Sequence, residues 1–420
     1  MRAGAKSAGI VLSVAAVGYL LAVSQRSTLG AASIVAIERF SISGEQLALL
    51  AVAQLGVYAL MQIPVGVLLD RFGPRVLLAF GGFVMGFGQL LVAYASSFET
   101  AAIGRLAVGF GDAFTFISMI RLINGWFEGA RATKLQQWMG NIGQLGQVVS
   151  AFPFALLLHL RGWQLAFVTW AALSLVTAAL VWILVSDDRV PYPHDHPRVS
   201  LRQAWRQLGV NLRSPSVRMA FWTHFTIQSP GTVMVLLWGM PFLVKAQGLP
   251  KPVAAGLLSM FVFVGICFGV IYGQICAKRP EWRKHLVFIL FSLTILAWAL
   301  VLSFSGQVPF AVLFALFFVL GISGPGSMLA FDFSKSSVPK SRLGSANGFI
   351  NIGGFLASFS MMYLIGVGLD WQHRLHPDES LYEVSGFKFA LLSQFFVLGI
   401  GISMFWFESR KASRESLPVE

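Results

Sequence analysis

Gly66-Val-Leu-Leu-Asp70-Arg71-Phe-Gly73-Pro-Arg75 joins two long apolar runs, near residues 45–70 and 75–96. Each run has about the 20 residues that a helix needs to cross a hydrocarbon layer of roughly 30 Å. The charged residues between them mark where the chain leaves the membrane, and Gly73 permits a tight turn. The stretch therefore predicts a helical hairpin in a bilayer, with its polar turn on one membrane face.

The composition extends this prediction to the whole chain. Of its 420 residues, 56% are hydrophobic and only 12% are charged, too few to cover the surface of a soluble protein. Inside hydrocarbon every backbone N–H and C=O must bond internally, and the apolar runs are too long for barrel strands. We therefore predict an all-α membrane protein. Its twelve predicted spans lie near residues 8–36, 45–70, 75–96, 99–125, 134–159, 163–187, 217–244, 252–277, 284–304, 308–333, 341–369 and 383–407.

The basic residues predict the orientation. Most of the 31 Lys and Arg residues lie in the loops and tails on the same face as Arg71. The positive-inside rule places that face, and with it both termini, in the cytoplasm, so we expect a multi-pass protein of the inner (cytoplasmic) membrane. The net charge of +13 is thus a topology signal. The basic residues are spread over every inner loop and tail rather than gathered into one patch, which argues against a nucleic-acid partner.

One polar stretch divides the chain into two halves. We predict a six-helix bundle over 1–187, a cytoplasmic linker over 188–216 and a second six-helix bundle over 217–420. Repeated six-helix halves around a midplane site are a known transporter plan. Leu201 and Leu208 recur at helical spacing in the linker, which fits both an amphipathic helix on the inner leaflet and a plain solvated linker.

Two motifs resemble the major facilitator superfamily. The 66–75 stretch resembles its signature loop G-x-L-x-D-R-x-G-R/K-R/K, with Pro74 replacing one basic residue, and residues 105–113 resemble its R-x-x-x-G-x-G-x-A pattern. The resemblance implies two pseudo-symmetric bundles that alternate access to a shared cavity. It also implies a gate at the inner helix ends, in which Gly66 would allow close helix approach and Arg75 would pair with Glu128. The predicted gating residues are Gly66, Asp70, Arg71, Gly73, Arg75 and Glu128.

The first span carries a candidate for substrate recognition. Gln25-Arg26 resembles the first helix of organic-anion symporters of the superfamily, in which an aspartate–arginine pair faces the cavity, but here Gln25 replaces the acidic residue. A cation without a partner at membrane depth favours an anionic substrate. The alternative is that Arg26 extends to the outer interface.

Polar residues in other spans complete the predicted site. His224 precedes a break at Pro230, where a cavity is common, and serves either as a substrate contact or as a satisfied bundle histidine. Asp112 is the preferred proton carrier, because burial favours its protonated form. Arg105 would tune the proton affinity of a neighbouring carboxylate, attract an anion or form a structural ion pair. The predicted substrate-binding residues are Arg26, Gln54, Tyr58, Gln144, Gln147, His224, Gln228, Trp238 and Asn351, and the proton-coupling residues are Asp112 and Arg105.

The leading hypothesis is a secondary active transporter that moves a small solute, of which an organic anion fits Arg26 best, by proton-coupled alternating access. A proton-driven efflux pump for drugs or metabolites and a transporter-like receptor or scaffold are the alternatives. No clustered nucleophile, base or metal ligands indicate an enzyme, and no phosphate-binding loop indicates ATP-driven transport. We expect no cofactor or metal; the expected partners are the solute, protons and membrane lipid, with the chain a monomer.

Overall fold

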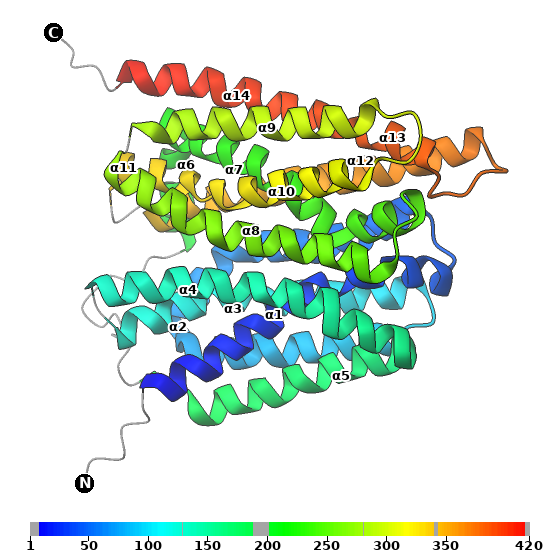
Figure 1. Cartoon of the computed structure of the whole chain (residues 1–420). Coiled ribbons are helices and arrows are strands. Elements are labelled where there is room, and N and C mark those ends of the chain that lie inside the picture. Colours follow the sequence, from blue (N-terminus) through cyan, green and yellow to red (C-terminus); the bar gives the residue numbers. More distant parts are fainter. Residues whose placement is uncertain (1–7, 128, 188–200, 280, 340–342, 416–420) are drawn as a thin grey trace. The chain divides into compact units, whose positions relative to one another are not determined.

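The computed structural model describes residues 8–127, 129–187, 201–279, 281–339 and 343–415. Within these ranges every regular element is a helix (Figure 1). From the N-terminus the helices are α1 (Ala8–Phe40), α2 (Gly44–Tyr94), α3 (Phe98–Trp126), α4 (Gly129–Val149), the π-helical η1 (Ser150–Phe154) and α5 (Ala155–Leu184). Next come α6 (Leu201–Arg213), α7 (Pro215–Val233), the π-helical η2 (Met234–Trp238) and η3 (Pro241–Ala246), and α8 (Lys251–Lys278). The last are α9 (Trp282–Ser303), α10 (Phe310–Gly326), α11 (Leu329–Ser337), α12 (Leu343–Leu375), α13 (Val384–Leu391) and α14 (Ser393–Glu415).

Ten helical segments in the described ranges are long and apolar enough to cross a membrane. One of them, Asn141–Leu184, has 44 residues, about twice the length of one crossing. It bends at Gly162, so it contains two of the predicted spans. The seventh predicted span is not among the ten, but it falls on the helical run of α7, η2 and η3. Each predicted span therefore coincides with helix.

Two glycines with positive φ end helices where the sequence predicts breaks. Gly73, in the signature loop, has φ 77° and ψ 163°, which gives the predicted turn inside α2. Gly162 has φ 80° and ψ 179° and separates the fifth and sixth predicted spans within α5. A side chain would strain this backbone region, so glycine is the residue that can turn the chain here.

The seventh span is broken by prolines. Pro230 lies inside α7 and Pro241 begins η3. A proline has no N–H to donate to the carbonyl four residues earlier, and π-helical segments commonly absorb such gaps. The predicted irregularity of this span is present as the π-helical turns Met234–Trp238 and Pro241–Ala246.

The chain divides into two compact units. The first unit contains Met1–Ser41 and Ala53–Leu201, and the second contains Ile42–Val52 and Arg202–Glu420. Each has its own apolar core, around Tyr19 and Met119 in the first and around Leu290 and Phe405 in the second. Residues 42–52 thus belong with the second unit, although they lie inside the predicted first bundle over 1–187.

A chemical reason for this assignment lies at the first turn of α2. Ser43 and Gln46 form a reciprocal capping box, in which each side chain accepts from the other's backbone N–H at 3.1 and 3.0 Å. The next two free donors, the N–H groups of Gly44 and Glu45, each donate to a carboxylate oxygen of Asp370 on α12 at 2.8 Å. A negative charge at a helix N-terminus is stabilising, so Asp370 holds this turn in the second unit.

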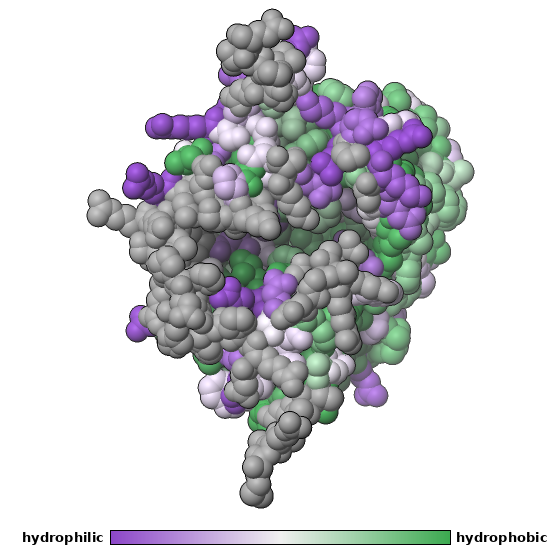
Figure 2. Space-filling model, turned by 90° about the vertical axis from the view of Figure 1, so that its left-hand side faces the viewer, coloured by the Kyte–Doolittle hydropathy of each residue, from purple (hydrophilic) through white to green (hydrophobic). Residues whose placement is uncertain are grey.

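Apolar side chains cover the flanks of the helices. Leu60 is 76% exposed and Phe396 is 68% exposed, which suits contact with lipid rather than water. Figure 2 looks onto one end of the molecule, where hydrophilic residues gather, while the flank at the right of the view is hydrophobic. This distribution is the one that a membrane-spanning bundle requires.

Candidate functional site

The centre of the first unit holds an ion pair between α1 and α3. Arg26 donates from Nε to Asp112 Oδ2 at 2.6 Å and from Nη2 to Oδ1 at 3.0 Å. The Asp112 side chain is fully buried and that of Arg26 is 13% exposed. The prediction that Arg26 lacks a partner is therefore wrong, since Asp112 supplies the carboxylate that Gln25 does not. Arg26 also does not extend to the interface.

Neighbouring groups fix the pair in place. The Arg26 guanidinium carbon lies 4.5 Å from the ring centroid of Tyr58, a cation–π contact with α2. Thr115 donates to the Asp112 backbone carbonyl at 2.7 Å and lies 3.3 Å from its Oδ1. Because the guanidinium is held on one face by the ring and on its edge by the carboxylate, its position is defined before any ligand arrives.

Arg105 is a second buried cation in α3. Its side chain is 2% exposed, and it donates to Thr28 Oγ1 at 3.1 Å and to the Arg26 carbonyl at 3.2 Å. Gln89 donates to the same Thr28 hydroxyl at 3.2 Å. Among the ion pairs of the described residues none involves Arg105, and its Nε has no hydrogen-bond partner there. The alternative of a structural ion pair for Arg105 is thus not what the structure contains.

Arg26, Arg105 and Asp112 form what we call the buried charge cluster, and it carries two positive charges against one negative. The glycines of the fourth predicted span explain how it assembles. A Cβ on Gly109 would collide with the backbone of Gln54, and a Cβ on Gly111 would lie 2.5 Å from the Gly81 carbonyl oxygen. Both glycines let α3 approach α2 closely, which brings Asp112 to the interior.

Uncharged amides of the first unit are also buried. Gln25 is fully buried and Gln54 is 1% exposed, and neither amide of these two residues makes a hydrogen bond within the described part of the chain. Gln144 and Gln147 are half-buried on α4, and the side-chain oxygen of each has no partner there. Buried amides without partners are uncommon, so these groups retain capacity for water or a ligand.

Three of the predicted substrate-binding residues, His224, Gln228 and Asn351, lie in the second unit. The His224 ring is fully buried, and its Nδ1 lies 3.2 Å from the Ser327 carbonyl oxygen. Gln228 and Asn351 lie next to the ring. The ring nitrogen Nε2 forms no hydrogen bond of normal geometry with any described residue. A Cβ on Gly354 of α12 would lie 2.8 Å from the ring, so this glycine admits the cluster. The three predicted residues therefore lie together.

The observed contacts of Trp238 are with other residues than these three. It is fully buried, donates from Nε1 to the Met362 carbonyl at 3.0 Å and packs edge-on against Phe387. Its only hydrogen-bonding group is used, so its observed contacts are those of a structural residue.

The predicted gate is described only in part. Glu128 and the side chain of Asp70 lie outside the described residues, so the predicted Arg75–Glu128 pair is not observed. Arg75 instead donates from Nε to the Trp182 carbonyl at 2.9 Å, and its backbone N–H donates to Asp187. Arg71 is exposed and lies over Phe72. A Cβ on Gly66 would meet no described atom within 4 Å, so the close helix approach expected there is absent from this structure.

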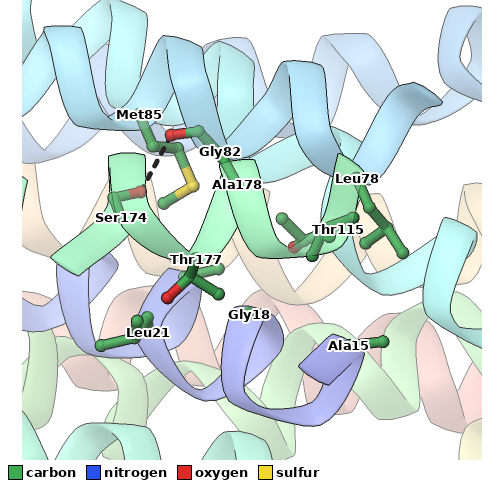
Figure 3. Close-up of a pocket in the computed structure, with 12 residues that line it drawn as sticks. Ala15, Gly18, Leu21, Leu78, Gly82, Met85, Thr115, Ser174, Thr177 and Ala178 are labelled. Carbon is green, nitrogen blue, oxygen red and sulfur yellow. Dashed lines mark hydrogen bonds between the residues drawn. The ribbon is translucent and has the colours of Figure 1, made fainter. Parts of the chain in front are cut away.

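A pocket lies beside the buried charge cluster in the first unit, between α1, α2, α3 and α5 (Figure 3). Small and apolar residues line it, among them Gly18, Gly82 and Ala178, and none of its lining residues is charged. Ser174 spends its hydroxyl on the Gly82 carbonyl at 2.9 Å. Thr115 both lines the pocket and contacts Asp112. The pocket is thus unsuited to an anion by itself.

Sequence reasoning missed the supporting residues Thr28, Gln89 and Thr115. Each is an ordinary small or polar residue of a membrane helix. Only the fold shows that Thr28 bonds to Arg105, that Gln89 bonds to Thr28 and that Thr115 bonds to Asp112. Helical spacing offers a weak signal for Thr115, which lies three residues after Asp112.

Solved structures share this fold. A bacterial homologue of the human lysosomal transporter Spinster, in an inward-facing and unoccupied conformation, aligns with a TM-score of 0.76 over 98% of this chain and 99% of that one, at 16% identity. A mutant form of the nucleoside transporter NupG aligns with a TM-score of 0.71 over 96% and 99%, at 15% identity. At such identities the likeness concerns the fold alone. It confirms the predicted all-α membrane fold.

Sequence relatives are transporters as well. The chain is 28% identical to the probable L-galactonate transporter of Escherichia coli K12 over 50% of its own length and 44% of the relative's. It is 24% identical to the probable galactarate/D-glucarate transporter of Bacillus subtilis 168 over 74% of each chain. The chain spans about half the length of the first curated relatives that it matches. The sequence profile of the Major Facilitator Superfamily matches residues 15–362, most of the chain, and the protein therefore belongs to that family.

Proposed function

We propose that this protein is a secondary active transporter of an organic anion, a hydroxylated carboxylic acid of the sugar-acid class, taken up together with a proton. The observation that carries the proposal is the buried charge cluster, in which Arg26 is paired with Asp112 and Arg105, bonded to the Arg26 carbonyl, adds a second positive charge. We further propose that the protein acts as a monomer in the cytoplasmic membrane. Both of its termini would lie inside the cell, as the distribution of basic residues predicts.

The excess positive charge is the reason for an anionic substrate. A buried cation without an opposite charge is expensive, and a bound carboxylate would compensate it. Guanidinium groups suit this task because their planar donors match the two oxygens of a carboxylate. Arg105 Nε is free to donate within the described structure, which supports a direct or water-mediated contact.

The relatives support the sugar-acid class. The proteins that this chain resembles are named for L-galactonate, for galactarate and D-glucarate, and for sulfoacetate, all of them acids. Sugar acids also carry several hydroxyl groups. The amides of Gln25 and Gln54, in the same unit as the buried charge cluster, offer buried donors and acceptors of the kind that hydroxyl groups need.

The Arg26–Asp112 pair supports proton coupling. Protonation of Asp112 would remove the charge that now holds Arg26, so the guanidinium would be free to bind the substrate carboxylate. Deprotonation would restore the pair and displace the substrate. One proton then accompanies one negative charge, which is the exchange expected for symport.

Uptake into proteoliposomes tests the proposal. Purified full-length protein is reconstituted, an inside-alkaline pH gradient is imposed, and labelled galactonate, glucarate and neutral galactose are compared. We expect at least one acid to accumulate several-fold above the gradient-free control, with no accumulation of galactose. Accumulation of galactose alone would contradict the anion assignment, and a protein that binds an acid without moving it would instead be a receptor.

A further inference from the structure

A cluster of cations on aromatic rings lies where α9 begins and α14 ends, in the second unit. Lys284 of α9 donates from Nζ to Ser413 Oγ of α14 at 2.9 Å, which joins the two helix ends. One turn inward, Phe288 and Phe405 continue the same contact with ring centroids 5.3 Å apart. Figure 1 shows α9 and α14 lying side by side.

The cations of this cluster rest on exposed rings. The Arg410 guanidinium carbon lies 3.3 Å from the Trp406 ring centroid, and Lys411 Nζ lies 4.1 Å from that of Phe407. Trp406 and Phe407 are 46% and 48% exposed. Both cations fold back by one helical turn along α14, so their charges stay close to the apolar surface instead of extending away from it.

A third pair of the same kind lies at the end of α8 and the start of α9. Arg279 lies 5.5 Å from the ring centroid of Trp282, which is 43% exposed. Tryptophan with basic neighbours at the end of a spanning helix is the pattern of a residue placed at the membrane–water boundary.

In the part of the chain that the structure describes, no carboxylate forms an ion pair with these cations. Among the described residues the ion pairs are Arg26–Asp112 and Arg218–Glu408, and none reaches Arg279, Lys284, Arg410 or Lys411. The buried Glu408 of α14 is occupied by Arg218 at 2.9 Å. Arg75 of the first unit differs from these cations, because the Trp182 carbonyl oxygen accepts a hydrogen bond from its guanidinium.

We propose that Arg279, Lys284, Arg410 and Lys411 with Trp282 and Trp406 form a binding site for the phosphate group of an anionic phospholipid. The rings place the cations at headgroup depth, and the negative surface of the inner leaflet supplies the missing anion. The acyl chains of such a lipid would lie against the exposed apolar side chains of α9 and α14, of which Ile289 and Phe396 are 49% and 68% exposed. The proposal does not depend on the transported substrate.

Native mass spectrometry of the full-length protein tests the site. Detergent-solubilised protein is titrated with phosphatidylglycerol and with phosphatidylcholine of identical acyl chains. We expect phosphatidylglycerol to bind more tightly than phosphatidylcholine. In R410Q/K411Q the affinity for phosphatidylglycerol should fall by roughly fivefold for each cation removed. The control K245Q/K251Q removes two exposed cations from the opposite end of the second unit and should bind as the unmodified protein does.

Three outcomes would overturn the assignment. These are equal binding of the two lipids, unchanged phosphatidylglycerol affinity in R410Q/K411Q, and displacement of the lipid by millimolar inorganic phosphate, which would indicate a site for a soluble anion. K284Q provides an independent variant if the double substitution unfolds, and it should weaken binding by roughly fivefold.

Discussion

Arg26 of α1 and Asp112 of α3 lie 86 residues apart in the chain and form a buried ion pair through two hydrogen bonds. The pair restores an acid–base couple that the first helix alone lacks, because Gln25 stands beside Arg26. It also leaves Arg105, on the same helix as Asp112, as a buried cation without an ion pair among the described residues.

Arg105→Gln should weaken binding of the anion. The substitution removes the excess positive charge but keeps a donor, and a hydrogen bond to a charged group is worth about 1.5–3 kcal/mol. We therefore expect the dissociation constant for the transported acid to rise by about 10- to 100-fold. Arg105→Lys keeps the charge and serves as the control. If both variants bound the acid with the affinity of the unmodified protein, Arg105 would have no part in substrate recognition. The measurement is binding of the labelled acid by scintillation proximity.

Gly109→Ala should destabilise the first unit. The added methyl group would collide with the backbone of Gln54, and overpacking of this kind costs about 1–3 kcal/mol. Gly56→Ala is the matched control, because a Cβ there meets no described atom within 4 Å. The apparent melting temperature in detergent should fall for Gly109→Ala only. Similar melting of both variants would show that α3 and α2 can separate without penalty.

Asp370→Asn should loosen the first turn of α2. The variant keeps the shape of the side chain but loses the negative charge that accepts from the Gly44 and Glu45 N–H groups, and such a cap is worth about 1 kcal/mol. Faster amide exchange at residues 44–47, measured by mass spectrometry, is the expected sign. Asp378→Asn, in an exposed loop, controls for a general effect of charge removal. Unchanged exchange would mean that Ser43 and Gln46 suffice.

Trp238→Phe separates a structural from a substrate-binding role. The variant loses the hydrogen bond to the Met362 carbonyl, so we expect a loss of stability of about 1 kcal/mol with substrate affinity unchanged within about twofold. Thermal unfolding and binding of the labelled acid are measured on the same preparation. A large loss of affinity at unchanged stability would restore the sequence-based prediction.

The sequence was sufficient for the fold because its signals are local. Apolar runs of spanning length, Gly73 and the breaks at Pro230 and Pro241 each act on their own segment, and each coincides with the observed helix or turn. The partner of Arg26 could not be found in this way. A pairing across 86 residues depends on the rotation of two helices about their axes, which no local pattern encodes, although the glycines that let α3 approach α2 belong to the motif over 105–113.

The same limit explains the gate. Arg75 has a main-chain carbonyl as its acceptor, at Trp182, and a main-chain carbonyl leaves no mark in the sequence. Gly66 fits the motif but has open space around it among the described atoms, so motif membership alone did not predict its packing. His224, Gln228 and Asn351 do lie together. Each is a polar residue of a predicted span, and the fold brings these spans into contact where α7 meets α12.

Coupled movement of anion and protons tests the central claim most directly. Proteoliposomes that contain a trapped pH indicator receive the transported acid outside, and anion uptake and internal acidification are recorded together. For the unmodified protein we predict one proton for each molecule of the acid, because Asp112 carries one proton. Asp112→Asn should still exchange labelled for unlabelled acid but should move no protons and show no gradient-driven accumulation. Proton movement in Asp112→Asn equal to that of the unmodified protein would contradict the account.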